Sequence, residues 1–303
     1  MIVIRECAGF EELEACVQLQ IEVWGYDASD IMPRKAFLVM QKAGGQVIGA
    51  FDTDLAGAGM RDGARSARGD GAKAFGDANS LVGFALSLPG VKSGEKYADG
   101  IPRAYLHSHM LAVKAGYRDR GLGRKLKLAQ RNEALTRGVT LMEWTFDPLE
   151  IKNAFLNIHK LGAVVCVYRE NFYGVSSSRL QGGLPTDRLL AEWYLNSDRV
   201  KGILEGRLAA AGPQVEERII EERIKVPASI YEWKSSERDR ERALAVQLEN
   251  RRRFQQAFSR GLAVIGFERD AEGNGTFELG ATSQLETGIT TFQVTASTGT
   301  ANL

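Results

Sequence analysis

The segment YLHSHMLAVKAGYRDRGLGRK, residues 105–125, constrains the fold of this chain more than any other feature. Residues 104–113 are predicted to form a strand and residues 122–137 a helix, with a basic glycine turn between them. Gly121 and Gly123 allow positive φ and a close approach of a ligand to the backbone. Free amides at the start of a helix, with the helix dipole and nearby arginines, form an anion site. We therefore expect the turn to bind a diphosphate.

The glycine spacing distinguishes this turn from two common phosphate-binding loops. The nucleotide loop G-x-x-x-x-G-K followed by Ser or Thr does not occur here. The dinucleotide fingerprint would need a third glycine where this chain has Leu126. An ordinary glycine turn with solvated arginines is the alternative interpretation. The strand before the turn and the helix after it favour the anion site.

Strand and helix patterns alternate over the first two thirds of the chain. Further strands are predicted at residues 2–4, 47–52, 81–88, 141–146, 164–168 and 191–195, and further helices at 10–24, 34–42 and 148–161. Asp147 is expected to cap the last of these helices, with Pro148 at its first position. The alternation predicts an α+β or layered α/β fold.

Composition divides the chain into three parts. Residues 1–200 are predicted to form the main domain, in which residues 53–80, rich in Gly, Ala, Arg and Asp, form a mobile insertion. Residues 201–280 are a smaller α+β extension, with a strand at 218–226, a long helix at 237–260 and a hairpin of 262–268 with 276–279. Residues 281–303 are small, polar and Thr-rich, so we expect a disordered tail.

Charge and cysteine content exclude several classes of protein. The net charge of +1 gives no reason to expect binding to nucleic acid or to a membrane surface. No apolar run approaches the length that spans a bilayer, and the start of the chain shows no secretory signal. The three cysteines are unclustered, which favours a reduced chain, and no usual metal-ligand spacing occurs. We expect a cytoplasmic protein without a metal.

Two motifs resemble a known family. The first is Gln or Arg, then x-x-G-x, then Gly or Ala, which residues 118–123 satisfy, and the second is AFLNIHKLGA at residues 154–163. With the element order of residues 1–200, these motifs resemble the Gcn5-related N-acetyltransferase superfamily. The resemblance implies a mixed central sheet flanked by helices, and acetyl-CoA or another acyl-CoA as co-substrate. It implies that loop amides bind the coenzyme A diphosphate, while a strand backbone and an asparagine contact pantetheine. The implied cofactor-binding residues are Leu111, Ala112, Val113, Arg118, Asp119, Arg120, Gly121, Leu122, Gly123, Arg124 and Asn153.

His107 and His109 lie two residues apart, so a strand places both side chains on one face. Near neutral pH an imidazole takes a proton from an ammonium well, and acyl transfer to an amine requires this step. The string HSHMLAV, residues 107–113, is similar to the H-x-H-x-L-A-V of arylalkylamine N-acetyltransferases. This resemblance implies that His107 is the base or holds a water and that His109 is its relay partner. The alternative is that the histidines fill a half-buried strand and bond a neighbour.

Many members of the superfamily protonate the departing thiolate with a tyrosine four residues before the glycine that ends the helix. Counting back from Gly162 gives Ile158, so this acid is missing from its usual place. Tyr168 and Tyr173 lie just downstream and could substitute, and we take Tyr168 as the candidate acid. A purely structural role is the alternative for both tyrosines.

The sequence thus predicts an acyl-CoA-dependent N-acyltransferase that modifies the amine of a small molecule, such as an amino acid, by direct attack. The acyl group is acetyl or larger, including succinyl. The alternative is a coenzyme-A-binding protein without transfer activity, acting as a sensor or assembly subunit. The expected partner is the small-molecule acceptor, and a homo-oligomer is left open.

Overall fold

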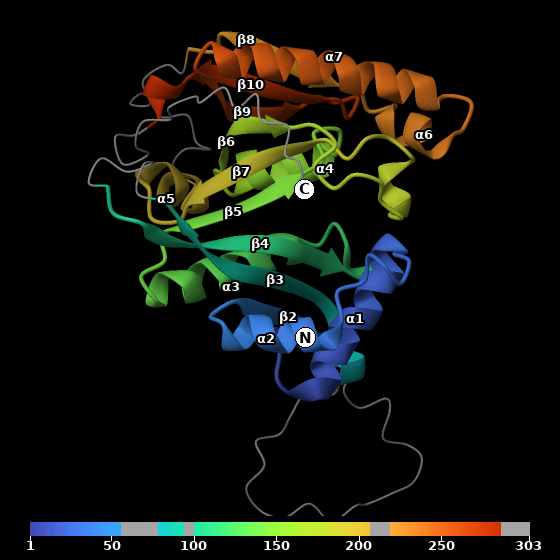
Figure 1. Cartoon of the computed structure of the whole chain (residues 1–303), viewed down its shortest axis with the longest axis vertical. Coiled ribbons are helices and arrows are strands. Elements are labelled where there is room, and N and C mark those ends of the chain that lie inside the picture. Colours follow the sequence, from blue (N-terminus) through green and yellow to red (C-terminus); the bar gives the residue numbers. More distant parts are fainter. Residues whose placement is uncertain (56–77, 94–99, 207–218, 286–303) are drawn as a thin grey trace, which may run out of the picture. The chain divides into compact units, whose positions relative to one another are not determined.

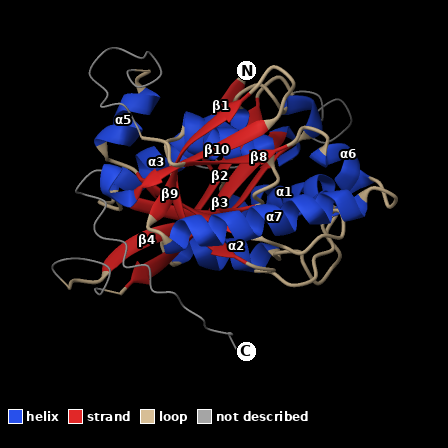
Figure 2. Cartoon of the chain, turned by 90° about the horizontal axis from the view of Figure 1, so that it is seen from above, coloured by secondary structure: helices blue, strands red, loops and turns tan. Residues whose placement is uncertain are grey.

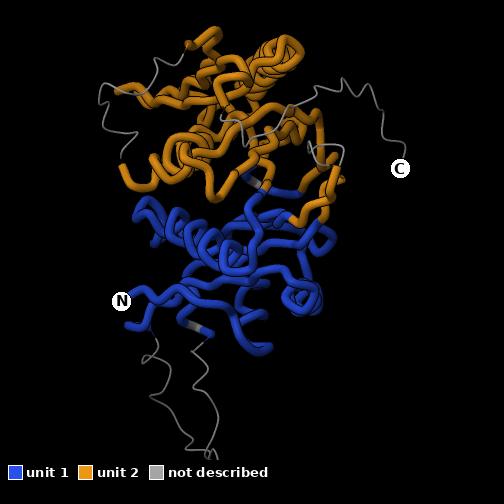
Figure 3. Tube along the Cα trace, turned by 90° about the vertical axis from the view of Figure 1, so that its left-hand side faces the viewer, with its two compact units in different colours: residues 1–90, 105–142, 177–180 blue, residues 91–104, 143–176, 181–303 orange. Residues whose placement is uncertain are grey.

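The computed structural model describes residues 1–55, 78–93, 100–206 and 219–285 (Figure 1). The chain divides into two compact units, which Figure 3 shows in blue and orange. Unit 1 comprises residues 1–90, 105–142 and 177–180, and unit 2 comprises residues 91–104, 143–176 and 181–303. Most of the predicted insertion, residues 56–77, and the predicted tail from residue 286 onward lie outside the described residues.

Unit 1 is built from the strands and helices of the first half of the chain. In chain order these are β1 (Ile2–Glu6), α1 (Gly9–Trp24), α2 (Arg34–Lys42), β2 (Gln46–Asp52), β3 (Leu81–Lys92), β4 (Arg103–Val113) and α3 (Leu122–Thr136). Short 3-10 turns lie at Ala78–Ser80 and Ala115–Tyr117. The strand order is β1-β2-β3-β4, and β2 is antiparallel to both of its neighbours. The last two residues of β3 and the first two residues of β4 belong to unit 2.

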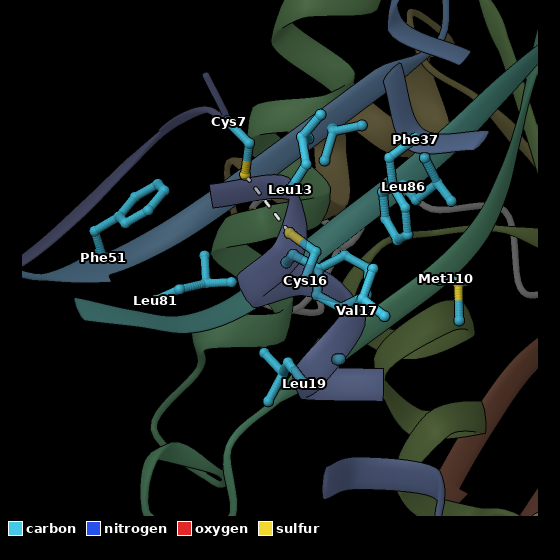
Figure 4. Close-up of a cluster of buried hydrophobic side chains, with 13 residues drawn as sticks. Cys7, Leu13, Cys16, Val17, Leu19, Phe37, Phe51, Leu81, Leu86 and Met110 are labelled. Carbon is cyan, nitrogen blue, oxygen red and sulfur yellow. Dashed lines mark hydrogen bonds between the residues drawn. The ribbon is translucent and has the colours of Figure 1, made fainter. Parts of the chain in front are cut away.

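Helices cover both faces of the sheet in unit 1. Figure 4 shows the core under α1 and α2, in which Leu13 and Phe37 of the helices cluster with Leu86 of β3. On the other face, Leu126 of α3 belongs to a second core with Ile48 of β2. Successive residues of β2 alternate between the two cores, and both faces are therefore buried. This explains why a strand of the sequence QVIGAFD is almost continuously apolar.

Unit 2 contains the remaining strands and helices. In chain order these are β5 (Leu141–Phe146), α4 (Ile151–Ala154), a π-helix at Phe155–Lys160, β6 (Val164–Arg169), β7 (Arg188–Tyr194), α5 (Asp198–Leu204), β8 (Glu222–Val226), α6 (Ile230–Ser235), α7 (Arg240–Ser259), β9 (Leu262–Arg269) and β10 (Gly275–Ala281). A short 3-10 turn lies at Thr282–Gln284, and another at Arg179–Gln181, of which residues 179 and 180 belong to unit 1. The first two residues of β5 belong to unit 1. The strand order is β5-β7-β6-β9-β10-β8.

The C-terminal strands extend the sheet of unit 2. β9 is antiparallel to β6 through the pair Val165 and Val264, and β10 lies between β9 and β8. The long helix α7, labelled in Figure 2, packs on these strands through Phe254. The ring of Phe254 stacks on Tyr168 of β6 at 5.7 Å and meets Phe277 of β10 edge-on at 5.1 Å. The domain boundary predicted at residue 200 stays a prediction, since the compact units divide the chain elsewhere.

The predicted α+β fold, a mixed sheet flanked by helices, is confirmed. β5 and α2 have the predicted bounds, and the other predicted elements occur with ends shifted by a few residues. The short helices α5 and α6 were not predicted from the sequence. Both span at most seven residues, too few for a hydrophobic period to be clear.

The prediction that Asp147 caps the helix after β5 is wrong. The helix begins at Ile151, three residues later than an Asp147 cap would place it. The Oδ1 atom of Asp147 accepts the N–H of Leu149 at 2.8 Å, and its Oδ2 atom accepts a bond from Lys234 at 2.9 Å. Lys234 also donates to Glu150 at 2.8 Å. The two carboxylates that would form a capping box therefore hold a buried lysine, and the chain turns before it becomes helical.

Candidate functional site

Strand β4 carries the two histidines of the predicted site in unit 1. Its even-numbered residues from Leu106 to Ala112 are buried, whereas His107 is half-buried and His109 is exposed. The two imidazole rings are neighbours, with their centroids 6.1 Å apart and their planes tilted by 40°. The prediction that both rings lie close together on the strand agrees with this geometry. A proton-transfer role for them stays a prediction.

The alternation of side chains along β4 is interrupted near His109. Ser108 bonds Lys127 of α3, and Leu111 also packs on the α3 side of the sheet. Met110 belongs instead to the core under α1 and α2. Regular alternation would place residues 108 and 111 on opposite faces, so one extra residue must be accommodated between them. The irregularity occurs where the exposed histidine lies.

The loop after β4 is tied back to the sheet. The hydroxyl of Tyr117 donates to the Oδ2 atom of Asp52 in β2 at 2.7 Å. The Nε atom of Arg118 donates to the carbonyl of Val113 at 3.1 Å, which closes the loop on the strand that precedes it. The hydrogen bond to Tyr117 is the main cause that lowers the pKa of Asp52, so the carboxylate is ionised at neutral pH. These two hydrogen bonds anchor the loop to β2 and β4.

Helix α3 begins without a capping side chain. Gly121 precedes it in the left-handed region, at φ 73°, and Asp119 also has positive φ, at 60°. The carbonyl of Gly121 accepts the N–H of Lys125 at 3.1 Å, which is the first helical bond. The first-turn amides have no partner within the helix, and the N-cap residue Gly121 has no side chain that could accept from them. This end of α3 can therefore donate several N–H groups to an anion.

Space and charge at this end of α3 suit an anionic ligand. A Cβ atom built on Gly121 would meet no atom within 4 Å. Arg118 and Arg120 are exposed, and Arg124 in the first helical turn is half-buried. The guanidinium of Arg120 lies 5.6 Å from the centre of the Tyr117 ring. The residues predicted to bind the diphosphate, 118–124, are thus gathered at one open helix terminus.

His109 has the protonation state that a base needs. Although the residue is exposed, desolvation of its ring lowers its pKa below the ordinary value of 6.5. The imidazole is therefore neutral at pH 7 and able to accept a proton.

Two of the predicted site residues lie in unit 2. Asn153 is exposed on α4. Tyr168 is buried in β6, and its hydroxyl donates to the Oδ2 atom of Asp187 at 2.6 Å. Desolvation and this hydrogen bond raise the pKa of Tyr168 far above its ordinary value. A phenol with so high a pKa is a poor acid, so the catalytic role of Tyr168 stays a prediction. The structure gives its hydroxyl a hydrogen bond to Asp187.

The sequence analysis did not predict a buried polar cluster of Ser108, Lys127 and Gln130, in which Ser108 lies between the two histidines in the chain. The Nζ atom of Lys127 donates to the Oγ atom of Ser108 at 2.7 Å, and this hydroxyl donates to Gln130 at 3.0 Å. All three residues are buried, and desolvation lowers the pKa of Lys127 well below its ordinary value. The only signal in the sequence was the position of Lys127 and Gln130 on the apolar side of α3, where lysine is rare.

In the part of the chain that the structure describes, no group of three or more His, Cys, Asp or Glu side chains is arranged to hold a metal ion. Over the same ranges, no helix combines the length and apolar character needed to cross a bilayer.

A scan against protein-family models finds no match, and a search of curated proteins finds none. Among solved structures, NAA60 of Arabidopsis thaliana in complex with acetyl-CoA is 15% identical over 65% of this chain and 100% of that chain, with a TM-score of 0.46. The ribosomal-protein-S18-alanine N-acetyltransferase of Escherichia coli is 15% identical over 72% of this chain and 100% of that chain, with a TM-score of 0.42. Aminoglycoside 6'-acetyltransferase type Ii is 15% identical over 64% of this chain and 98% of that chain, with a TM-score of 0.42. Likeness at this level carries no conclusion about activity or acceptor.

Proposed function

We propose that this protein is an acyl-CoA-dependent N-acyltransferase, as its loop and strand motifs imply. The observation that carries the proposal is the open N-terminus of α3, which follows β4 through a loop with Gly121 in the left-handed region. Its uncapped amides and the arginines at positions 118, 120 and 124 suit the diphosphate of coenzyme A. The pantetheine contacts of residues 111–113 and of Asn153 remain implied by the family resemblance alone.

The histidines give the site its chemistry. An amine acceptor is charged at neutral pH and must lose a proton before its nitrogen can attack a carbonyl carbon. The neutral imidazole of His109, 6.1 Å from that of His107 between ring centres, can take this proton directly or through its neighbour. The nitrogen then bonds to the thioester carbon, the C–S bond breaks, and the electron pair leaves with sulfur. A backbone N–H of β4 near the irregularity would stabilise the oxyanion.

The acceptor proposed is a small molecule such as an amino acid, and the acyl group is acetyl or larger. The near-neutral net charge of +1 supports a small acceptor, because it gives no reason to expect overall attraction to a charged protein tail. The second candidate, a coenzyme-A-binding protein without transfer, is favoured by the absence of tyrosine at position 158. Release of free thiol only in the presence of an amine would distinguish the enzyme from this candidate.

Binding of acetyl-CoA tests the proposal, with two glycines as a matched pair. Gly121 and Gly138 lie at opposite ends of α3, both have positive φ (73° and 74°), and a Cβ on either would meet open space. Gly121→Glu and Gly138→Glu should therefore carry similar backbone strain. We expect Gly121→Glu to weaken binding by about two orders of magnitude, since like charges in contact cost several kcal/mol. Gly138→Glu should bind as the unmodified protein does, measured by calorimetry. Equal binding by both variants would contradict the loop assignment.

The histidines are tested by turnover rather than binding. We expect His107→Gln and His109→Gln to reduce kcat by about 10²-fold or more, as loss of a general base does, and to leave acetyl-CoA affinity unchanged. The pKa of His109 lies below 6.5, so the rate should fall as the pH drops through this pKa, because the ring then becomes protonated. A rate that depends on neither histidine would favour the binding protein over the enzyme.

A further inference from the structure

The polar cluster that joins β4 to α3 is costly to bury. The Nζ atom of Lys127 donates to the Oγ atom of Ser108 at 2.7 Å, and this hydroxyl donates to the Oε1 atom of Gln130 at 3.0 Å. All three residues are at most 5% exposed. The Nε2 atom of Gln130 is sealed from solvent and has no hydrogen-bond partner among the described residues. Burying an amine and leaving an amide N–H unpaired both reduce the free energy of unfolding.

Apolar side chains would be the more stable choice at this interface. Desolvation lowers the pKa of Lys127 well below its ordinary value, which reflects the same cost of burial. Replacing a buried charged group by apolar residues of similar volume is often neutral or stabilising. Natural chains break such rules of stability mainly at functional sites. The place where the cluster holds β4 therefore indicates what it does.

The cluster holds β4 directly before the irregularity in this strand. Ser108 lies on the α3 side of the sheet, Met110 on the side of α1 and α2, and Leu111 on the α3 side again. Two residues, 109 and 110, thus lie between two positions on the same side, where regular alternation allows only one. This is the pattern of a β-bulge, and His109 is one of its two residues.

The bonds to Ser108 make the bulge necessary. After the bulge, residues 110–113 alternate between the two apolar cores, which fixes the orientation of that end of β4. A regular strand in the same phase would turn Ser108 toward α1 and α2, and both histidines toward α3. Lys127 and Gln130 hold Ser108 on the α3 side instead. The imidazoles of residues 107 and 109 then lie near each other, with their centroids 6.1 Å apart.

We propose that Lys127 is a positioning residue for the acyl transfer, which acts through Ser108 to hold the bulge of β4 and the two imidazoles beside it, an inference that rests on the proposed function. Lys127 acts on the strand and not on the reacting atoms. An apolar residue at position 127 would stabilise the interface but release Ser108, and His109 would then lose its fixed place. The lysine is therefore kept for its effect on the rate.

The histidines themselves report on this role, so the first test needs neither cofactor nor acceptor. The chain has three histidines, and the third, His159, lies on the π-helix of unit 2 and serves as an internal reference. Nuclear magnetic resonance follows the ring protons against pH in the unmodified protein, in Lys127→Met and in Ser108→Ala, which is the smaller change in volume. We expect both substitutions to shift the resonances of His107 and His109. The pKa of His109 should move toward 6.5, because its ring loses the surroundings that desolvate it.

Lys125→Met is the matched control, since Lys125 is exposed on the same helix. It removes an ammonium from α3 but leaves the bonds of Ser108 in place, so all three histidine titrations should stay unchanged. The double variant separates the hydrogen bond from a direct effect of the amine. In the Ser108→Ala background, Lys127→Met should add no further shift. Histidine titrations that Lys127→Met leaves unchanged would overturn the inference, and so would an effect of Lys127→Met that persists without Ser108.

Turnover connects the positioning to catalysis. With acetyl-CoA and a mixture of free amino acids as acceptors, Lys127→Met should lower kcat by about tenfold or more and leave the affinity for acetyl-CoA unchanged. A displaced base reduces the rate of the chemical step rather than the binding of the co-substrate. An unchanged kcat in a variant whose histidines have shifted would overturn the inference and leave the proposed function standing. Failure of the folded, unmodified protein to bind acetyl-CoA would overturn both.

Discussion

Lys127 of unit 1 and Lys234 of unit 2 are both almost fully buried, with 3% and 6% of their surfaces exposed, but their pKa values move in opposite directions. Desolvation lowers the pKa of Lys127 well below its ordinary value. Desolvation also acts on Lys234, but Asp147 and Glu150 outweigh it and raise the pKa to about 12. The difference is one of partners: Lys127 donates to the hydroxyl of Ser108, and Lys234 donates to two carboxylates.

This contrast shows that burial alone does not determine what a lysine contributes to stability. The cost of removing an ammonium from water is similar in both places, so the neighbours decide its net effect. In unit 2 the lysine compensates the buried carboxylate of Asp147 and the half-buried carboxylate of Glu150, although desolvation still raises the pKa of Glu150. In unit 1 a neutral hydroxyl offers far less compensation. The two lysines should therefore respond to the same substitution with opposite signs.

The largest effect is expected for Lys234→Met. Removing the ammonium leaves the buried Asp147 and the half-buried Glu150 without their cation, and breaking such a group costs about 3–5 kcal/mol. Chemical denaturation at pH 7 would measure the loss in the free energy of unfolding. The difference from the unmodified protein should shrink as pH falls through the carboxyl range, because the uncompensated carboxylates then take up protons. An unchanged stability at pH 7 would mean that the ion pairs contribute nothing.

A smaller effect of opposite sign is expected for Lys127→Met. Replacing a poorly compensated buried amine by an apolar side chain of similar length should stabilise the protein by about 1–3 kcal/mol at pH 7. Because the folded-state pKa lies below the unfolded one, the cost of burying Lys127 is greatest at low pH and disappears as pH rises toward 10.5. The gain should therefore disappear over the same range in denaturation experiments. A loss of stability at pH 7 would show that the hydrogen bond to Ser108 outweighs desolvation.

The smallest effect is expected for Ser108→Ala. The substitution removes one acceptor from Lys127 and one donor to Gln130, which should cost about 1 kcal/mol. In the Lys127→Met background the same change should cost less, because one of its two hydrogen bonds is already gone. A double-mutant cycle isolates this coupling between the two residues. Strictly additive changes in the free energy of unfolding would indicate that the bond from Lys127 to Ser108 has no net value.

Where local sequence determines conformation, the prediction of the fold agreed with the structure. β4, the glycine turn and α3 follow from apolar pattern and from the backbone freedom of Gly121, all within a segment of about twenty residues. The environments of the two lysines could not be predicted in this way. The carboxylates that hold Lys234 lie 84 and 87 residues away along the chain, so no local pattern distinguishes it from a surface lysine.

In the candidate site, too, the local features were predicted and the features that depend on distant contacts were not. The motif of residues 118–123 is local, and the structure gathers it at one helix terminus. The helix that leads to Gly162 contains a π turn at Phe155–Lys160, which no local pattern of the sequence predicts. The hydrogen bond of Tyr168 to Asp187 depends on a contact between residues of different elements. Such features become visible only when the chain is folded.

The cysteines provide a built-in reporter of how the two units open. In unit 1 the Sγ atoms of Cys7 and Cys16 lie 3.8 Å apart in the core of Figure 4. Cys166 lies in unit 2, where burial raises the pKa of its thiol well above the ordinary value. Cys7 and Cys16 are buried and Cys166 is half-buried, so labelling of the first two requires local opening, and the change of each labelling rate with denaturant measures unfolding around that thiol. One denaturant dependence for all three thiols would mean that the units open together, and separate dependences would mean that each unit is its own cooperative element.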